Sequence, residues 1–273
     1  MKDSHTVQLI WNNHCHVVVF SDDFTKYVSV RTHPNDLDIC TGSIFQYIHI
    51  SDKPNVHLSK INMYINHLTT SYENAENGVS RISPEIMEMD GMSGTKTRHF
   101  YNNLLQIDDA RYLEVGTWKG SSVCAAMCGN SATVVCIDNW CQFNGPKEEF
   151  IRNFNMFKGL NTAIYIESDC FQLDITRLPK FNIYMYDGEH SLQSHYNALI
   201  YYYDRMDDVF IYVVDDWNLS KVRDGTVAAI KKLNLQILFE KQIILTTDDM
   251  ITPQPLASET WWNGIYFAVL QKV

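Results

Sequence analysis

The chain has 273 residues, of which 45% are hydrophobic and 20% charged, and this globular composition excludes a disordered or fibrous protein. Lys and Arg number 22 against 32 Asp and Glu, and a net charge of −10 argues against a nucleic-acid partner. No stretch approaches the roughly 18 apolar residues of a membrane helix, no signal peptide is evident, and the seven scattered cysteines include no CxxC pair. We therefore expect a cytoplasmic protein with reduced thiols and no membrane partner.

The first part of the chain predicts short strands, because runs rich in β-branched and aromatic residues alternate with Asn, Asp, Pro and Gly. These runs cover residues 7–11, 17–20, 27–31 and 44–50. A helix is expected over residues 59–67, and the polar segment 71–80 is interpreted as a linker. Residues 1–85 are therefore predicted to form a small β-rich module, for either oligomerisation or acceptor recognition.

The remaining residues, 86–273, alternate between apolar runs and helical stretches. Strands are expected at residues 112–115, 133–137, 163–166, 182–186 and 210–214, and helices at 121–128, 147–157, 191–204 and 225–233. Two further strands, 236–240 and 265–270, close the chain. Most of the runs are continuously hydrophobic, as burial on both faces of a parallel sheet requires. The pattern predicts an α/β fold with a doubly wound, mostly parallel, seven-stranded sheet.

A glycine-containing turn follows the first of these strands, in the sequence Tyr-Leu-Glu-Val-Gly-Thr-Trp-Lys-Gly-Ser-Ser over residues 112–122. Gly116 permits a tight turn, and Gly120 would let a ligand approach the start of the next helix. A nicotinamide dinucleotide is disfavoured, because Trp118 stands where the second glycine of its binding pattern would be. The alternative is that both glycines only permit close packing of strand and helix.

Acidic residues end the next two strands at the same edge of the sheet, where ligands of open α/β sheets bind. Asp138 would accept hydrogen bonds from both hydroxyls of a ribose. Asp169 would meet an adenine amino group. Together with the glycine turn, these two residues predict a nucleoside-binding pocket.

The segments Glu-Val-Gly-Thr-Trp-Lys-Gly, Val-Cys-Ile-Asp and Glu-Ser-Asp resemble class I S-adenosylmethionine-dependent methyltransferases over about residues 90–273. The resemblance implies a Rossmann-like methyltransferase fold and S-adenosylmethionine as cofactor. It also implies a cofactor-binding set comprising Glu114, Gly116, Gly120, Ser121, Asp138 and Asp169. It leaves the first ~90 residues unexplained.

More carboxylates end the two following strands, in Asp-Gly-Glu-His at residues 187–190 and Asp-Asp-Trp at 215–217. Parallel strands deliver their ends to one edge, so Asp187 is expected to face Asp215 and Asp216. Three converging carboxylates would repel one another without a cation, and oxygen ligands of this kind suit Mg²⁺ or Mn²⁺. The sequence therefore predicts a divalent metal site with these three aspartates as ligands.

This pairing resembles the metal-dependent O-methyltransferases that act on macrolide and aminocoumarin sugars. The resemblance implies Asp187, Asp215 and Asp216 as metal ligands and either His190 or Glu189 as the general base, with His190 ranked first because histidine titrates near neutral pH. It also implies transfer of a methyl group to a hydroxyl of a small polyol, such as a sugar or a glycosylated metabolite. Two alternatives remain: a non-catalytic cofactor-fold binding module, and a metal-dependent hydroxylase on a similar sheet.

Two further groups of residues are weighed as parts of the pocket. Met92, Ser93 and Arg98 precede the first strand of the sheet and would either border the cofactor or form a linker and packing helix. Four tryptophans lie beside strand ends or turns, where aromatic faces stack on sugar rings or pack in the core. They are Trp140, Trp217, Trp261 and Trp262.

Overall fold

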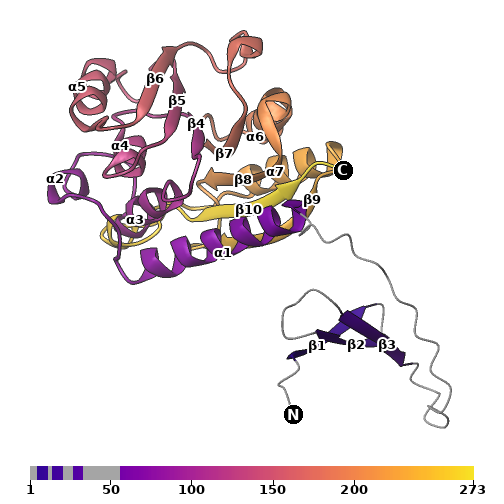
Figure 1. The fold of residues 1–273 in the computed structure, drawn as a ribbon. Helices are drawn as coiled ribbons and strands as arrows, with labels where there is room; N and C mark the ends of the chain where they lie inside the picture. Colours follow the sequence, from indigo (N-terminus) through magenta and orange to yellow (C-terminus); the bar gives the residue numbers. More distant parts are fainter. Residues whose placement is uncertain (1–4, 12–13, 21–26, 33–55) are drawn as a thin grey trace. The chain divides into compact units, whose positions relative to one another are not determined.

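The computed structural model describes residues 5–11, 14–20, 27–32 and 56–273, and the chain divides into two compact units, Met1–Ser59 and Lys60–Val273. The first unit contains an antiparallel sheet of β1 (His5–Trp11), β2 (His14–Phe20) and β3 (Tyr27–Thr32), in that order (Figure 1). These strands confirm three of the four expected near the N-terminus, whereas the expected strand at 44–50 lies outside the described residues.

Helix α1 (Val56–Glu76) occupies most of the segment that we interpreted as a linker, so that interpretation was wrong. Buried residues recur along it at intervals of three and four, which keeps one face against the core through the polar stretch. They are Ile61, Tyr64, Leu68, Ser71 and Ala75. The second compact unit therefore begins before the expected boundary between residues 85 and 86, and the role of residues 1–85 stays a prediction.

The second unit is built on the predicted seven-stranded sheet, which is confirmed, with the strand order β6-β5-β4-β7-β8-β10-β9 (Figure 1). The strands from β6 to β8 are parallel, and β10 runs antiparallel to both β8 and β9. Their bounds are β4 (Arg111–Val115), β5 (Thr133–Asp138), β6 (Thr162–Glu167), β7 (Phe181–Tyr186), β8 (Met206–Asp215), β9 (Gln236–Ile243) and β10 (Ile265–Gln271).

Helices cover both faces of this sheet, as a doubly wound fold requires (Figure 1). On one face, Tyr112 and Val134 pack with α1, α3 (Thr95–Leu104), α4 (Ser121–Met127) and α5 (Lys147–Phe157). On the other, Leu113 and Val135 pack with α6 (Leu192–Tyr202) and α7 (Ser220–Lys232). Neighbouring strand residues thus enter opposite cores, which is the two-residue period of a strand.

Short elements complete the second unit. They are α2 (Pro84–Met87), α8 (Leu256–Glu259) and two 3₁₀ turns, η1 (Ile175–Arg177) and η2 (Tyr203–Arg205). Helix α6 begins after Ser191, whose hydroxyl accepts the backbone N–H of Ser194 at 3.1 Å. Helix α7 begins earlier than the expected residue 225, because the Asp249 carboxylate accepts both the N–H and the hydroxyl of Ser220.

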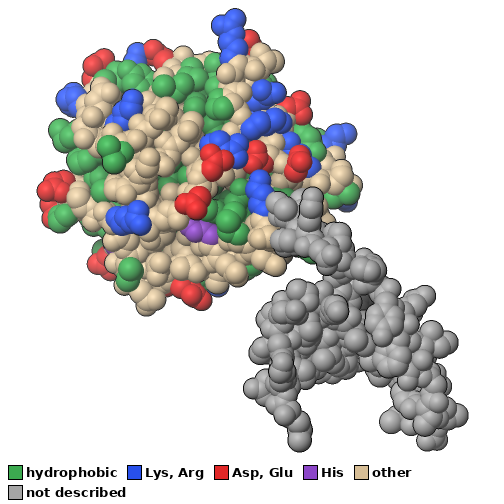
Figure 2. All heavy atoms as spheres, viewed as in Figure 1, with side chains coloured by type: hydrophobic (Ala, Val, Ile, Leu, Met, Phe, Trp, Pro, Cys, Tyr) green, Lys and Arg blue, Asp and Glu red, His purple; other side chains and the backbone are tan. Residues whose placement is uncertain are grey.

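The strand order reverses between β4 and β7, since β5 and β6 extend the sheet on one side and β8 on the other. The loops after β4 and β7 therefore diverge and leave a crevice at the carboxyl edge, the usual ligand site of such sheets. Within the described residues, no helix has both the length and the apolar character to cross a membrane. Acidic and basic side chains are interspersed on the face of this unit drawn in Figure 2.

Candidate functional site

A cavity of about 910 Å³ opens at this carboxyl edge of the sheet. Each of five neighbouring strands, from β6 to β8, sends a residue to its wall just beyond the strand or at its end. These residues are Gly116, Asp138, Asp169, Asp187 and Asp216. The volume is near the upper end of the ~300–1,000 Å³ typical of small-molecule sites. The expected convergence of strand ends on one cavity is thus present.

Both glycines of the turn after β4 have backbone angles that favour glycine, with φ of +87° at Gly116 and +88° at Gly120. A Cβ on Gly116 would lie 1.9 Å from the carbonyl oxygen of Asp187, and one on Gly120 would lie 3.1 Å from the Phe150 ring. Close packing therefore explains both residues. Gly116 also lines the cavity, whereas Gly120 does not.

Glu114 is fully buried and does not line the cavity. Its carboxylate accepts hydrogen bonds from Ser122 at 2.5 Å and Tyr112 at 2.7 Å. Burial raises the pKa of this carboxyl to about 8. The next helix residue, Ser121, does line the cavity, and its hydroxyl lies 2.8 Å from that of Ser93.

Asp138 is oriented by the backbone of the glycine turn. Its Oδ2 accepts the N–H groups of Thr117 at 2.7 Å and Trp118 at 2.9 Å, and its Oδ1 accepts that of Trp140 at 2.7 Å. The carboxylate is therefore fixed at the cavity wall, with most of its acceptor capacity in use. At Asp169, Oδ1 accepts the N–H of Phe171 at 2.8 Å, and Oδ2 accepts no hydrogen bond from the described residues.

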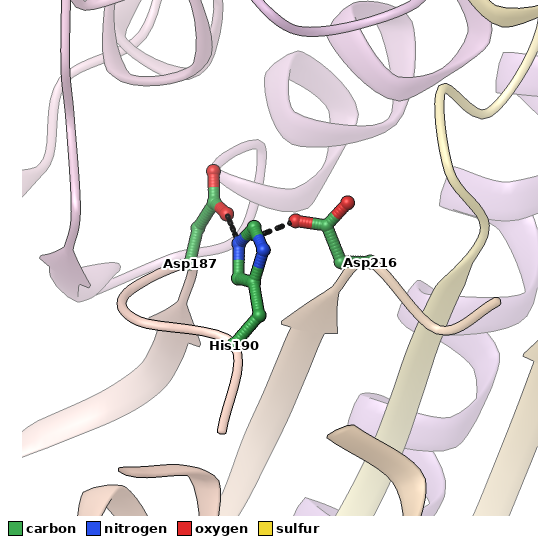
Figure 3. Close-up of side chains that lie close together, drawn as sticks. All are labelled: Asp187, His190 and Asp216. Atoms are coloured by element: carbon green, nitrogen blue, oxygen red, sulfur yellow. Dashed lines mark ion pairs between the residues drawn. The ribbon is translucent and has the colours of Figure 1, made fainter. Parts of the chain in front are cut away.

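The imidazole of His190 lies between the carboxylates of Asp187 and Asp216, as Figure 3 shows. Its Nε2 is 2.8 Å from Oδ2 of Asp216 and 3.9 Å from Oδ1 of Asp187. One ligand atom from each of the three residues falls within 4.8 Å of the others, a spacing at which they could hold a metal ion. The two strand ends and the loop after β7 thus form a compact acid–imidazole group.

Asp215 does not belong to this group, although we expected it beside Asp216 as a metal ligand. Its side chain is buried, and Oδ1 accepts the backbone N–H of Asp216 at 2.8 Å, while Oδ2 is 3.5 Å from the Tyr101 hydroxyl. Asp215 ends β8 and Asp216 has a φ of +56°, so the chain turns between them. Both residues line the cavity, but only the carboxylate of Asp216 lies with those of the acid–imidazole group.

Burial and neighbouring charges act in opposite directions on the pKa values of Asp216 and His190. Burial raises the pKa of Asp187 above its ordinary value. Burial also acts to raise the pKa of Asp216, but hydrogen bonds from His190 and Asn263 outweigh it and lower that pKa. For His190, the two carboxylates outweigh burial and raise its pKa. In the structure as it stands, the imidazolium form is therefore favoured and offsets the negative charge.

Asn263 is a site residue that the sequence did not reveal. Its side-chain amide donates to Oδ1 of Asp216 at 2.7 Å, and its side-chain oxygen accepts the N–H of Thr252 at 2.8 Å. Its carbonyl accepts the N–H of Asn218 at 2.8 Å, next to the antiparallel pairing of Ile265 with Asp215. The pairing of β10 with β8 in this register brings Asn263 to the acid–imidazole group. No spacing pattern in the sequence predicts that contact.

Arg98 shapes the cavity without lining it. It is buried, and its guanidinium donates to the carbonyls of Ile86 and Met87 at 2.9 Å and of Met89 at 2.8 Å, as well as to Ser93. The loop folded around it carries Met92 and Ser93 into the cavity wall. Of the three residues weighed in this segment, two therefore line the site and the third holds their loop.

No protein-family model and no curated protein matches the chain. Similar solved structures include an O-methyltransferase from Bacillus cereus in complex with SAH, 15% identical over 78% of this chain and 91% of that one, with a TM-score of 0.47. TomG from Streptomyces achromogenes, an O-methyltransferase involved in tomaymycin synthesis and solved with SAM, is 13% identical over 75% and 89%, with the same score. Cofactor-bound Rv0187 from MTB is 14% identical over 81% and 100%, also at 0.47. Identities and scores this low do not carry a function across, so this chain's own residues must decide it.

Proposed function

We propose that the protein is an S-adenosylmethionine-dependent O-methyltransferase. One observation carries the proposal: a single cavity contains both the glycine turn with its flanking acids and the acid–imidazole group. A nucleoside-bearing methyl donor and an acceptor hydroxyl could thus lie side by side. The division of the wall into these two regions supports a bimolecular transfer better than the binding of one ligand.

The first region fits the cofactor. Gly116 and Ser121 line the wall where its amino-acid portion would lie, and Asp138 would accept hydrogen bonds from the ribose. A ribose hydroxyl would displace the long 3.3 Å contact that the Thr117 hydroxyl makes with Asp138. The unpaired Oδ2 of Asp169 would accept a hydrogen bond from the adenine amino group. Glu114 and Gly120 would act indirectly, Glu114 through its hydrogen bonds to Ser122 and Tyr112 and Gly120 through its packing against Phe150.

The second region fits a divalent cation. Asp187 and Asp216 supply carboxylate oxygens of the kind that Mg²⁺ and Mn²⁺ prefer, and the adjacent imidazole of His190 is kept for the role of base. Asp215 also lines the cavity, and because its Oδ1 accepts the N–H of Asp216, it would join through Oδ2, which lies 3.5 Å from the Tyr101 hydroxyl. A bound cation would lower the pKa of an acceptor hydroxyl, and its charge would offset the carboxylates that raise the pKa of His190, which favours the neutral imidazole that a base requires.

The chain's own residues would align the acceptor and remove its proton. Asp216 fixes the orientation of His190 through Nε2, which leaves Nδ1 as the basic nitrogen. Glu189 also lines the cavity and is the second candidate for the base, with its carboxylate held by the Ser191 hydroxyl at 2.5 Å. In the proposed transfer the base would take the hydroxyl proton, the acceptor oxygen would bond to the methyl carbon, and the carbon–sulfur bond would break to leave a neutral thioether.

A small polyol, such as a sugar or a glycosylated metabolite, is the acceptor class that we propose. The wall on this side offers amide, carboxylate and hydroxyl groups for several hydroxyls, among them Gln254, Asn263 and Thr252. The hydroxylase alternative is not favoured, because the iron site of such enzymes takes two histidines and one carboxylate, whereas the described group has one histidine.

The proposal is tested with a panel of polyols and glycosides, methyl-labelled S-adenosylmethionine, and either Mn²⁺ or EDTA. We expect label in one class of acceptor, none in EDTA, and recovery when Mn²⁺ or Mg²⁺ is restored. Asp216→Asn should abolish transfer while calorimetric cofactor affinity stays near that of the wild type, and Asp138→Asn should weaken cofactor binding about tenfold or more. Full transfer in EDTA would remove the metal, and a wild type that binds no cofactor would remove the enzyme assignment.

A further inference from the structure

Three of the tryptophans weighed as ligand platforms are instead core residues. Trp140, Trp217 and Trp261 are all buried, and each packs against another aromatic ring. The partners are Phe150 at 4.9 Å, Tyr266 at 4.4 Å and Tyr72 at 5.7 Å between ring centroids, respectively. The indole N–H of Trp261 is also bonded, to Glu76 at 2.7 Å. Trp217 and Trp261 do not line the cavity, and Trp140 lines it with only 7% of its surface exposed.

Trp262 differs from them. It is only partly buried and lines the cavity, and within residues 56–273 its ring has no aromatic partner and its indole N–H no hydrogen-bond acceptor. Trp118 also lines the cavity, but its indole N–H donates to the carbonyl of Phe143 at 3.2 Å, and the Lys119 ammonium lies 4.8 Å from its ring centroid. Trp262 thus offers an uncommitted aromatic face to the cavity.

The backbone holds Trp262 in an unfavourable conformation. Its φ is +57°, in the left-handed region that bulky residues rarely adopt and that glycine occupies two residues later at Gly264. Its N–H is bonded to the carbonyl of Ala257 at 3.2 Å. On one side it follows the buried Trp261, and on the other it precedes Asn263, which is bonded to Asp216. A strained aromatic residue that contributes little to packing is typical of a functional position.

We propose that Trp262 is the platform on which the acceptor stacks, which makes it a specificity-determining residue for acceptors built on a six-membered ring with neighbouring hydroxyls. This inference rests on the proposed methyl transfer. The face of such a ring, whether the C–H face of a pyranose or the π face of a catechol, suits the indole surface. Trp262 and Asn263 both line the cavity, and Asn263 bonds to Asp216, so a ring stacked on Trp262 would present its hydroxyl edge to the acid–imidazole group.

The test measures binding rather than turnover. Saturation-transfer NMR would follow two probes, methyl α-D-mannopyranoside and catechol, on protein loaded with S-adenosylhomocysteine. We expect Trp262→Ala to weaken binding of at least one probe about tenfold, and Trp262→Phe to weaken it less because a ring remains. Trp118→Ala is the matched control from the other region of the cavity, and it should weaken S-adenosylhomocysteine binding more than probe binding.

The outcomes separate this inference from the proposed function. If S-adenosylhomocysteine does not bind the wild type, the methyltransferase proposal fails. If it binds, but neither probe binds or Trp262→Ala binds both as the wild type does, the role of Trp262 is overturned. Loss of pyranoside binding alone identifies a sugar-like acceptor, and loss of catechol binding alone identifies an aromatic one. If Trp262→Ala fails to fold, tryptophan fluorescence is measured on adding each probe to the wild type and to Trp262→Phe. The difference between the two fluorescence changes then reports contact of the probe with Trp262.

Discussion

Replacing Glu114 by Gln should stabilise the protein at alkaline pH, although this residue belongs to the motif that suggested the cofactor. The buried carboxyl has a pKa of about 8, against 4.5 in the unfolded chain. Between these values the folded protein keeps a proton that the unfolded chain releases, so stability falls as pH rises through this window. At about 1.36 kcal/mol for each pH unit, the wild type loses on the order of 5 kcal/mol across it.

Glu114→Gln removes this pH dependence and keeps the shape of the side chain. At pH 4.5 the variant should equal the wild type or lose about 1 kcal/mol, because the amide must bond to the hydroxyls of Ser122 and Tyr112. At pH 8 it should be more stable by several kcal/mol. Urea unfolding of both proteins at intervals between pH 4.5 and 8.5 measures the difference. A difference that does not change with pH would refute the reasoning.

Asp207 provides a control of opposite sign. Burial acts to raise its pKa, but hydrogen bonds from Arg111 at 2.8 Å and Lys60 at 3.1 Å outweigh burial and lower it. The carboxylate therefore stabilises the fold above its unfolded pKa, and this contribution is lost as the pH falls. Asp207→Asn should consequently be less stable than the wild type at pH 8, with the gap closing in acid. The gap for Asp207→Asn should stay constant between pH 4.5 and 8.5 and close only as the pH falls below the ordinary aspartate pKa of 3.8, whereas the Glu114→Gln difference should grow between pH 4.5 and 8.

Two further variants test the packing of the site. Gly116→Ala should lose about 3 kcal/mol or more of unfolding free energy, because its Cβ would meet the Asp187 carbonyl oxygen at 1.9 Å. Gly78→Ala is the control: Gly78 has a φ of +66°, and the nearest atom to an added Cβ is 3.8 Å away. In the same unfolding measurement it should lose only the ~1 kcal/mol that backbone strain costs. Equal losses would contradict the clash. In Arg98→Lys the ammonium cannot supply all the hydrogen-bond donors of the guanidinium, so the loop that carries Met92 and Ser93 should loosen. Calorimetry should then find weaker cofactor binding, and limited proteolysis should cleave near Met92 faster. Unchanged values would show that this loop keeps its conformation without Arg98.

The sequence predicted the parts of the fold in which local pattern and tertiary structure agree. The apolar runs of the parallel strands indicate burial on both faces of the sheet. The acidic residues that end these strands lie at one edge of the sheet, independently of the loop conformations. Helix α5 (Lys147–Phe157) has the predicted bounds, since its buried Phe150 and Phe154 repeat at helical spacing. The cavity and five of its acidic or glycine residues followed from this regularity.

What the sequence missed depends on contacts between distant segments. Residues 71–76 are mostly polar, so their composition masked a helix whose buried face continues through Ser71 and Ala75. The first turn of α7 is held by Asp249, a residue from another loop. The separation of Asp215 from Asp216 and the arrival of Asn263 both follow from the turn after β8 and the antiparallel register of β10. Contacts of this kind can be predicted only once the three-dimensional arrangement of the segments is known.

Asp187 couples the two regions of the cavity. Its N–H donates to the carbonyl of Val115 at 2.8 Å, its own carbonyl occupies the space left by the missing side chain of Gly116, and its carboxylate faces His190. The glycine turn and the acid–imidazole group are therefore fixed to each other by the pairing of β4 with β7, without an intervening flexible loop. The proposed displacement would need its nucleophile and its methyl donor held in line within a fraction of an ångström. A backbone junction of this kind would supply that constraint without help from either proposed ligand.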